Sequence, residues 1–226
     1  RDVTGVQTCA LPISIRTTTS GEIAAFIAEP IQGVAGFVTP PPAYFKRVHE
    51  IVKKYGGLYI SDEVQTGVGR TGNHWFGILH SGFTPDIVTM AKGLGNGAPI
   101  GGLLTRPEIS AAVAGKIAFS TFAGNPWTTL QADETLAILE EEKILEKAAR
   151  QGAIFEAALR EQLGDLAPVG DIRGRGLMWG IELVKDRASK APATELMTEV
   201  MERTRELGLL IGRGGLDSNV IRHSPP

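Results

Sequence analysis

Three things are scarce in this sequence: cysteine, long apolar runs and an excess of charge of one sign. The single Cys cannot form a disulfide within the chain, so we expect a reducing, cytoplasmic compartment. No apolar run approaches the roughly 18 residues that span a bilayer, and we expect no membrane partner. With Lys+Arg 23 against Asp+Glu 25, the near-neutral balance argues against nucleic-acid partners.

Glycine, in contrast, is abundant. The chain has 28 glycines in 226 residues, or about 12% against a usual share of about 7%. A chain of this length has room for one or two domains with a real core. The question is whether the glycines are spread as turns or gathered at sites.

Periodicity divides the chain into regions. Residues 1–16 show neither helical nor strand periodicity, so we assign them as a tail that need not be native to the protein. From Gly21 on, short apolar runs alternate with helical stretches, which predicts an α/β fold with a mostly parallel sheet. Short apolar runs predict buried strands at 23–28 and 58–60, and further strands are predicted at 86–91 and 103–105, with a helix over 43–55. A long helix over 127–163 then leads to a strand-containing stretch at 169–186, a helix over 195–207 and a further strand from 209, typical of a separate α+β domain.

Ionisable residues stand at the ends of three predicted strands. These residues are Glu29, Asp62 and Lys92, and ligands bind outside the carboxyl ends of the strands in parallel α/β sheets. The connections contain glycines that would let backbone approach a ligand: Gly67, Gly69, Gly72, Gly93, Gly95 and Gly97. A carboxylate and a lysine at this edge suit pyridoxal 5′-phosphate, which needs a lysine for its Schiff base and an acid to keep its ring nitrogen protonated.

The two groups meet different physical demands. Lys92 must lose its proton to attack an aldehyde, and burial or a nearby cation would favour this by lowering its pKa. Asp62 must stay ionised beside a pyridinium ring, whose positive charge helps it to do so. Once released, the lysine can move a proton as general base and general acid. Taken alone, the Asp62-Glu63 pair is more typical of a turn or a helix cap.

Several motifs resemble the class-III aminotransferases, which are fold-type-I pyridoxal-phosphate enzymes and usually homodimers. The resemblance runs from about Gly21 to the last residue. It implies part of a large domain with a mostly parallel sheet (17–142), then a linker helix and a truncated α+β C-terminal domain (143–226). The motifs are FIAEPIQG, SDEVQTGVGRTG, PDIVTMAKGLGNGAPIGG, STFAGNP, VGDIRGRGLMWGIEL and VIRHSPP.

The resemblance implies catalytic and cofactor-binding roles at one edge of the sheet. Lys92 matches the Schiff-base lysine, and Asp62 matches the partner of the pyridine nitrogen. Val64 matches the residue packed on one ring face, and Gln65 the residue near the phenolic oxygen. Glu29 belongs to the strand-end motif that lines the same site.

Two further roles concern the neighbouring subunit and the substrate. Thr121 matches a threonine that reaches the neighbouring subunit's cofactor phosphate, so the site would depend on dimerisation. Arg222 matches the arginine that grips the substrate carboxylate through a bidentate fork. Relatives acting on ornithine or 4-aminobutyrate carry a second acid that can pair with this arginine, where this chain has Val34. The difference favours the branch that acts on alanine and glyoxylate, or on β-amino acids and pyruvate.

Two parts of the family pattern have no counterpart. No segment resembles the small-residue loop that cradles the phosphate or the aromatic that stacks on the ring, and the sequence stops just after Arg222. We therefore interpret the chain as a fragment, and expect these 226 residues alone to show little transamination.

Other functions fit less well. Gly93-Leu94-Gly95-Asn96-Gly97 departs from a dinucleotide fingerprint, no P-loop motif is present, and the four His lack metal-ligand spacing. We therefore expect no metal. The open alternatives are an aminomutase, a decarboxylating transaminase or an inactive fragment. The expected substrates are an amino acid (alanine or a β-amino acid) and a 2-oxo acid such as glyoxylate or pyruvate.

Overall fold

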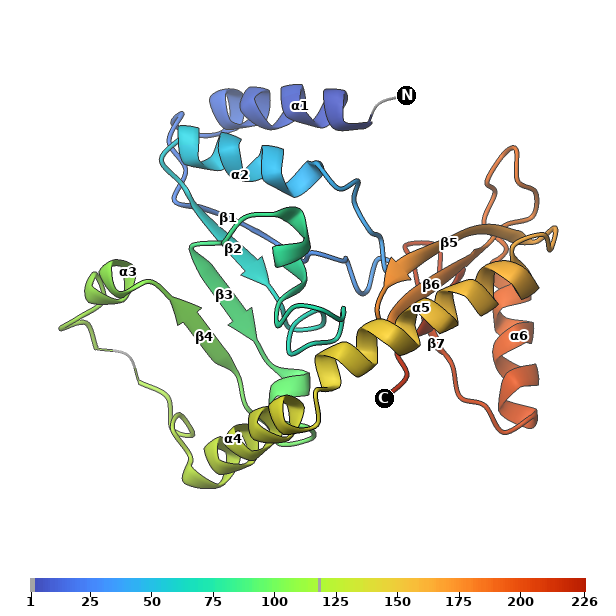
Figure 1. Cartoon of the computed structure of the whole chain (residues 1–226). Coiled ribbons are helices and arrows are strands. Elements are labelled where there is room, and N and C mark those ends of the chain that lie inside the picture. The colour runs from blue at the N-terminus through green and yellow to red at the C-terminus, as the bar shows by residue number, and fades with distance from the viewer. Residues whose placement is uncertain (1–2, 118) are drawn as a thin grey trace. The chain divides into compact units, whose positions relative to one another are not determined.

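The computed structural model describes residues 3–117 and 119–226, which form two compact units (Figure 1). The first unit contains the described parts of 1–30, 40–68 and 76–143, and the second contains 31–39, 69–75 and 144–226. The short segments 31–39 and 69–75 thus belong with the C-terminal part of the chain, although no change in composition marks them.

A four-stranded sheet organises the first unit. Its order is β1-β2-β3-β4, with β1, β2 and β3 parallel and β4 antiparallel to β3. The strands are β1 (Ala25–Ala28), β2 (Leu58–Asp62), β3 (Ile87–Met90) and β4 (Gly102–Thr105). The predicted mostly parallel sheet is confirmed.

Helices cover this sheet and lie in its connections. Helix α2 follows β1, and α1 lies alongside α2 (Figure 1). The apolar face of α2 buries Phe45, Val48 and Val52 against Tyr59 of β2 and Ile78, which together form the core of this unit. The helical elements are α1 (Val3–Thr18), α2 (Tyr44–Lys54), η1 (Gly77–Ser81), η2 (Lys92–Leu94), α3 (Pro107–Ala111) and α4 (Pro126–Glu141).

Two expectations about the start of the chain differ from the structure. No regular element was expected over residues 1–16, yet α1 forms there, because Ile15 is buried and Leu11 packs against the core cluster. Tertiary packing stabilises a helix that periodicity alone does not reveal. Residues 23–28 were expected to form a buried strand, but β1 is an edge strand and Ile27 is 58% exposed.

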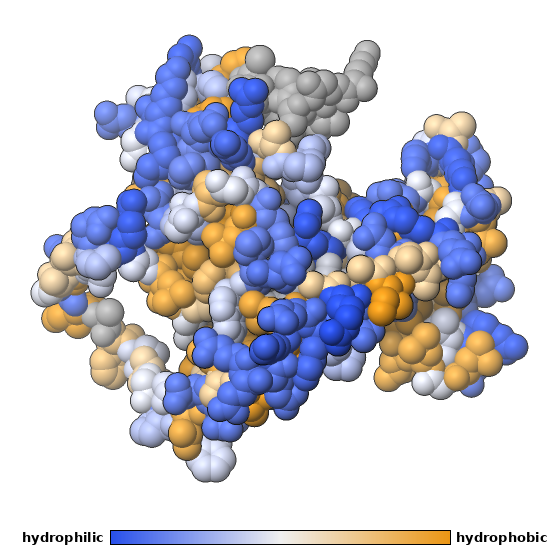
Figure 2. Space-filling view, in the orientation of Figure 1, coloured by the Kyte–Doolittle hydropathy of each residue, from blue (hydrophilic) through white to orange (hydrophobic). Residues whose placement is uncertain are grey.

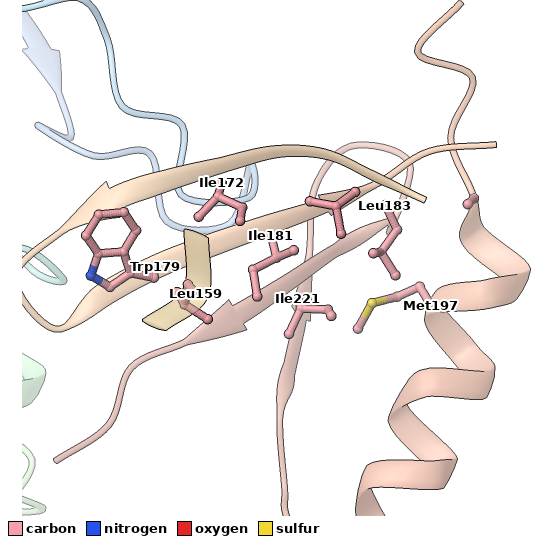
Figure 3. Close-up of a cluster of buried hydrophobic side chains, with 9 residues drawn as sticks. Leu159, Ile172, Trp179, Ile181, Leu183, Met197 and Ile221 are labelled. Carbon is pink, nitrogen blue, oxygen red and sulfur yellow. The ribbon is translucent and has the colours of Figure 1, made fainter. Parts of the chain in front are cut away.

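The second unit contains an antiparallel sheet and two helices. All its pairs are antiparallel in the order β5-β6-β8-β7. Apolar side chains of the sheet pack against the helices, with Ile181 in the middle of the cluster, Trp179 toward one end and Met197 on the neighbouring helix (Figure 3). The predicted α+β character is confirmed. The elements are α5 (Ile144–Leu163), β5 (Val169–Arg175), β6 (Met178–Leu183), α6 (Thr194–Glu206), β7 (Gly212–Gly214) and β8 (Val220–His223).

The predicted continuous helix over 127–163 is wrong. The chain forms α4 and α5 instead, because Lys143 between them has a φ of 52° and therefore leaves the right-handed helical region. The strand expected from Leu209 begins only at Gly212.

Candidate active site

Register brings the three charged strand ends to one edge of the first sheet. Ala28 lies opposite Ser61 in the β1–β2 pair, and Asp62 lies opposite Thr89 in the β2–β3 pair. Glu29 directly follows β1, Asp62 ends β2 and Lys92 follows β3 by two residues. A carboxylate and an amine on adjacent strands therefore leave the sheet at the same end.

Lys92 has an unusual backbone conformation. Its φ is 45°, in the left-handed region that side-chain-bearing residues rarely adopt. It follows an extended Ala91, and its carbonyl accepts the Gly95 amide at 3.1 Å, which closes the short helix η2. Strained backbone of this kind gathers at functional sites. Lys92 is exposed in this chain, so the burial expected to favour its neutral form is not supplied by the described residues.

Asp62 is held by the turn that follows it. Its Oδ1 accepts the Val64 amide at 3.1 Å, and the Glu63 amide donates to Thr89 O at 2.9 Å, extending the link between β2 and β3 by one residue. Val64 and Gln65 lie in this turn and are partly buried. The arrangement fixes the direction of the Asp62 carboxylate.

Glu63, next to Asp62, has a role that the sequence analysis missed. It is 1% exposed, and its carboxylate accepts hydrogen bonds from Ser61 Oγ and Thr66 Oγ1 and from the Gly77 and Ile78 amides. The local signal was two hydroxyl residues: Ser61, two positions before Glu63, and Thr66, three positions after it. The amide donors 14 and 15 residues further on could not be inferred.

Several glycines that we expected to make room for a ligand pack against the protein itself. A Cβ on Gly67 would lie 2.7 Å from Glu63 O, and one on Gly95 would lie 2.3 Å from Ala98 O. Only Gly93 and Gly97, beside Lys92, have open space: the nearest atom to a Cβ on Gly93 is 3.8 Å away, and none lies within 4 Å for Gly97. The ligand-facing glycines are therefore fewer than the sequence suggested.

Thr121 lies in an exposed turn ahead of α4. Asn125 caps that helix, with its Oδ1 accepting the Trp127 amide at 3.0 Å. On either side of Thr121, Phe119 is 89% and Phe122 is 82% exposed. Both aromatic side chains beside Thr121 are thus almost fully exposed within the described residues.

Arg222 lies on β8 in the second unit. Its Nη1 donates to Gly33 O at 3.2 Å, and its guanidinium carbon lies 5.4 Å from the centre of the Phe37 ring. Its Nε is buried without a hydrogen-bond partner. Val34 is exposed, and among the described residues no carboxylate forms an ion pair with Arg222. The guanidinium thus keeps donors for an anionic ligand.

Arg173 positions the loop beside Arg222. Its Nε donates to Gly36 O at 3.0 Å, and its Nη1 pairs with Glu182 at 2.5 Å and Asp171 at 3.0 Å. The loop 31–39 that carries Phe37 is in this way fixed to the second sheet.

Comparisons with known proteins agree with one another. The chain matches the model of the aminotransferase class-III family over residues 7–226. It is 47% identical over 212 residues to alanine–glyoxylate aminotransferase 2 homolog 2, a mitochondrial protein of Arabidopsis thaliana, covering 94% of this chain and 44% of that protein. It is 43% identical over 204 residues to a leucine/methionine racemase of Thermococcus litoralis, covering 90% of this chain and 45% of that protein.

A solved structure shows the same likeness in three dimensions. A Bacillus anthracis aminotransferase superposes with a TM-score of 0.90 at 38% identity, covering 97% of this chain and 51% of that one. The chain spans about half the length of the relatives it matches. Both the sequence matches and this superposition extend over nearly all the described residues, and the chain belongs to the class-III aminotransferases, a family of pyridoxal-phosphate-dependent enzymes.

Proposed function

We propose that the full-length protein containing this chain transfers an amino group from alanine or a β-amino acid to a 2-oxo acid such as glyoxylate or pyruvate. One observation carries the proposal: Asp62 and Lys92 lie at the ends of neighbouring parallel strands, and the backbone of Lys92 is in the left-handed region. The donor set fits pyridoxal phosphate, because one carboxylate, one amine and the open backbone at Gly93 and Gly97 lie at the same edge.

Each residue at this edge has a distinct task. When bound, pyridoxal phosphate supplies an electron sink that stabilises negative charge beside the substrate nitrogen. Asp62 would hold the ring nitrogen of the cofactor through a hydrogen bond, and the Val64 amide keeps its carboxylate oriented. Lys92 Nζ would hold the cofactor covalently and would move a proton as base and then as acid.

Neighbouring side chains complete the cofactor edge. Val64 would pack on one face of the ring, Gln65 would lie near its phenolic oxygen, and Glu29 would line the same edge from β1. The turn after Asp62, which carries Val64 and Gln65, supports this placement. None of these roles requires a metal ion.

Arg222 binds the substrate carboxylate in this proposal. A backbone carbonyl and the face of Phe37 hold its guanidinium, and its Nε is buried and makes no hydrogen bond within the described residues. Position 34 holds a valine where some family members have an acid that can pair with this arginine. Arg222 is therefore suited to the α-carboxylates of alanine, glyoxylate and pyruvate.

Relatives named as racemases favour a second candidate function, which is another reaction on the same cofactor. Product analysis separates amino-group transfer from racemisation, amino-group migration and release of CO₂.

The functional unit we propose is a homodimer. Its support is the exposed aromatic pair beside Thr121, which a partner subunit would cover while Thr121 reaches that partner's cofactor phosphate.

A cytoplasmic location stays a prediction, because one relative is mitochondrial by name. None of the described helices has both the length and the apolar character needed to cross a membrane.

The first test is whether Lys92 holds the cofactor. In the full-length protein loaded with pyridoxal phosphate, we expect borohydride to fix the cofactor on the peptide that contains Lys92, as measured by mass spectrometry. Lys92→Ala should abolish both the fixed cofactor and the transamination of alanine with glyoxylate. Lys46→Ala, which removes an exposed lysine of α2, is the control and should change neither. Cofactor still fixed at an unchanged level in Lys92→Ala would overturn the proposal.

A further inference from the structure

We propose that Glu63 is a positioning residue that fixes the Asp62 carboxylate toward the cofactor; this inference rests on the proposed function. Glu63 does not face the site itself. Side chains alternate along the extended chain, so Ser61 and Glu63 point to one side and Asp62 to the other. Ser61 and Glu63 are buried, whereas Asp62 is partly exposed, as this alternation requires.

The carboxylate of Glu63 is saturated by four donors. Oε1 accepts Ser61 Oγ at 2.9 Å and the Ile78 amide at 2.8 Å. Oε2 accepts Thr66 Oγ1 at 2.5 Å and the Gly77 amide at 2.8 Å. Each oxygen thus receives one hydroxyl and one backbone amide, so both oxygens of the carboxylate act as hydrogen-bond acceptors.

These bonds join two segments that are distant in the sequence. Ser61 ends the β1-paired part of β2, and Gly77 and Ile78 begin η1. The backbone of Glu63 adds two bonds, from its amide to Thr89 O and from the Gly67 amide to its carbonyl, both at 2.9 Å. Residues on both sides of Asp62 are therefore fixed, and the direction of its side chain follows from theirs.

A glutamine at position 63 cannot reproduce this pattern. Its amide has nearly the same shape, but whichever way it is turned, its NH₂ group faces the N–H of Gly77 or Ile78. The hydroxyls of Ser61 and Thr66 can rotate to accept, whereas a backbone N–H can only donate. One buried donor is left unsatisfied, and the strand end must shift to relieve it.

The experiment measures cofactor binding by the full-length apoprotein. We expect Glu63→Gln to raise the dissociation constant for pyridoxal phosphate by about tenfold or more, the effect of one unsatisfied buried group. kcat should fall while KM for the 2-oxo acid stays within about twofold, because Arg222 is unaffected. The matched control is Glu141→Gln at an exposed helix end, which should leave both quantities unchanged.

A double-mutant cycle with Asp62→Asn separates positioning from general destabilisation. If Glu63 acts through Asp62, Glu63→Gln weakens cofactor binding in the wild-type background but adds little when Asp62 is already Asn. An equal loss in both backgrounds, or wild-type cofactor binding by Glu63→Gln, overturns the inference.

A second pair of variants covers the case in which Glu63→Gln does not fold. Thr66→Val removes one hydroxyl donor while keeping the shape, and Thr66→Ser restores the hydroxyl. We expect Thr66→Val to bind the cofactor more weakly than wild type and Thr66→Ser to bind it as wild type does. The effect of Thr66→Val should again be absent in the Asp62→Asn background. Equal cofactor affinity of Thr66→Val and Thr66→Ser overturns the inference. The wild-type protein is measured first. If it holds no cofactor at Lys92, the proposed function is wrong and the proposed role of Glu63 is wrong with it. This outcome is visible before any Glu63 variant is measured.

Discussion

At the scale of single residues, one glycine lies in a helix interior, where a methyl group would ordinarily be stabilising. Gly152 is in the middle of α5 and is buried against the turn between β5 and β6. A Cβ there would lie 2.4 Å from Gly176 O and 2.6 Å from Gly176 Cα. Gly176 has little room to move away, because its carbonyl accepts the Trp179 indole N–H at 2.7 Å and a Cβ built on it would lie 2.5 Å from Thr71 C.

We therefore predict that Gly152→Ala destabilises the protein. In an open helix interior, replacing Gly by Ala stabilises by about 1 kcal/mol. Here the methyl group overlaps backbone atoms, and we expect the free energy of unfolding to fall by about 1–3 kcal/mol. Urea denaturation of the full-length protein measures it. Gly101→Ala is the control, because its Cβ would meet Met90 O at an ordinary 3.5 Å. A stabilised Gly152→Ala protein would contradict the close approach of α5 to this turn.

At the scale of elements, the Asp86 carboxylate connects α2, β2 and the end of β4. It is 4% exposed and accepts the Tyr59 amide at 2.7 Å, Lys53 Nζ at 3.0 Å and Arg106 Nη2 at 2.7 Å. Burial by itself would raise the pKa of Asp86. The Tyr59 hydrogen bond and the two cations outweigh it and hold the pKa below its ordinary value.

This lowered pKa predicts a pH-dependent contribution to stability. A carboxylate with a lower pKa in the folded state stabilises fully above its unfolded value of about 3.9, and the contribution is lost as pH falls through the folded value. Lys53 and Arg106 are about half exposed, so water screens them, and we expect Asp86→Asn to cost about 1–2 kcal/mol at pH 7.

The measurement is the difference in unfolding free energy between wild type and Asp86→Asn as a function of pH. We expect the difference to shrink as pH falls below about 4. Asp133→Asn, at an exposed position on α4, should show no such trend. A difference that stays constant down to pH 3 would mean that the Asp86 charge does not stabilise these elements.

At the scale of the whole molecule, the first unit leaves apolar surface uncovered. Figure 2 shows apolar side chains at the surface in the region of β3, β4 and α4. They include Leu103 and Leu104 of the edge strand β4 and Leu130 of α4. The relatives are about twice as long as this chain.

The proposed dimer predicts complementation between two inactive variants. Lys92→Ala lacks the cofactor lysine, and Thr121→Asp places a negative charge against the cofactor phosphate. If Thr121 serves the neighbouring site, a mixed dimer of the two full-length variants contains one intact site. Equal co-expression should then restore activity in about a quarter of all sites. If Thr121 served its own subunit, no mixed dimer would have an intact site, and activity would stay absent.

The placement of the three charged residues at one edge of the sheet could be predicted from the sequence because its signals are local. Apolar runs that end in Glu29, Asp62 and Lys92 indicate strands and their carboxyl ends, and parallel pairing then brings those ends together. The motifs likewise predicted the family. The break at Lys143 has no local signal as clear, because the residues around it favour a helix and only the left-handed φ shows the break.

By itself, the sequence determined which charged groups stand at the ends of strands and which family the chain belongs to, since short-range patterns encode both. Tertiary structure alone decided that Glu63 saturates its carboxylate with amides 14 and 15 residues away, and that most of the site's glycines pack against the protein's own atoms. The physical reason is that hydrogen bonding and close packing depend on which distant segments meet, and residue order alone does not specify those meetings.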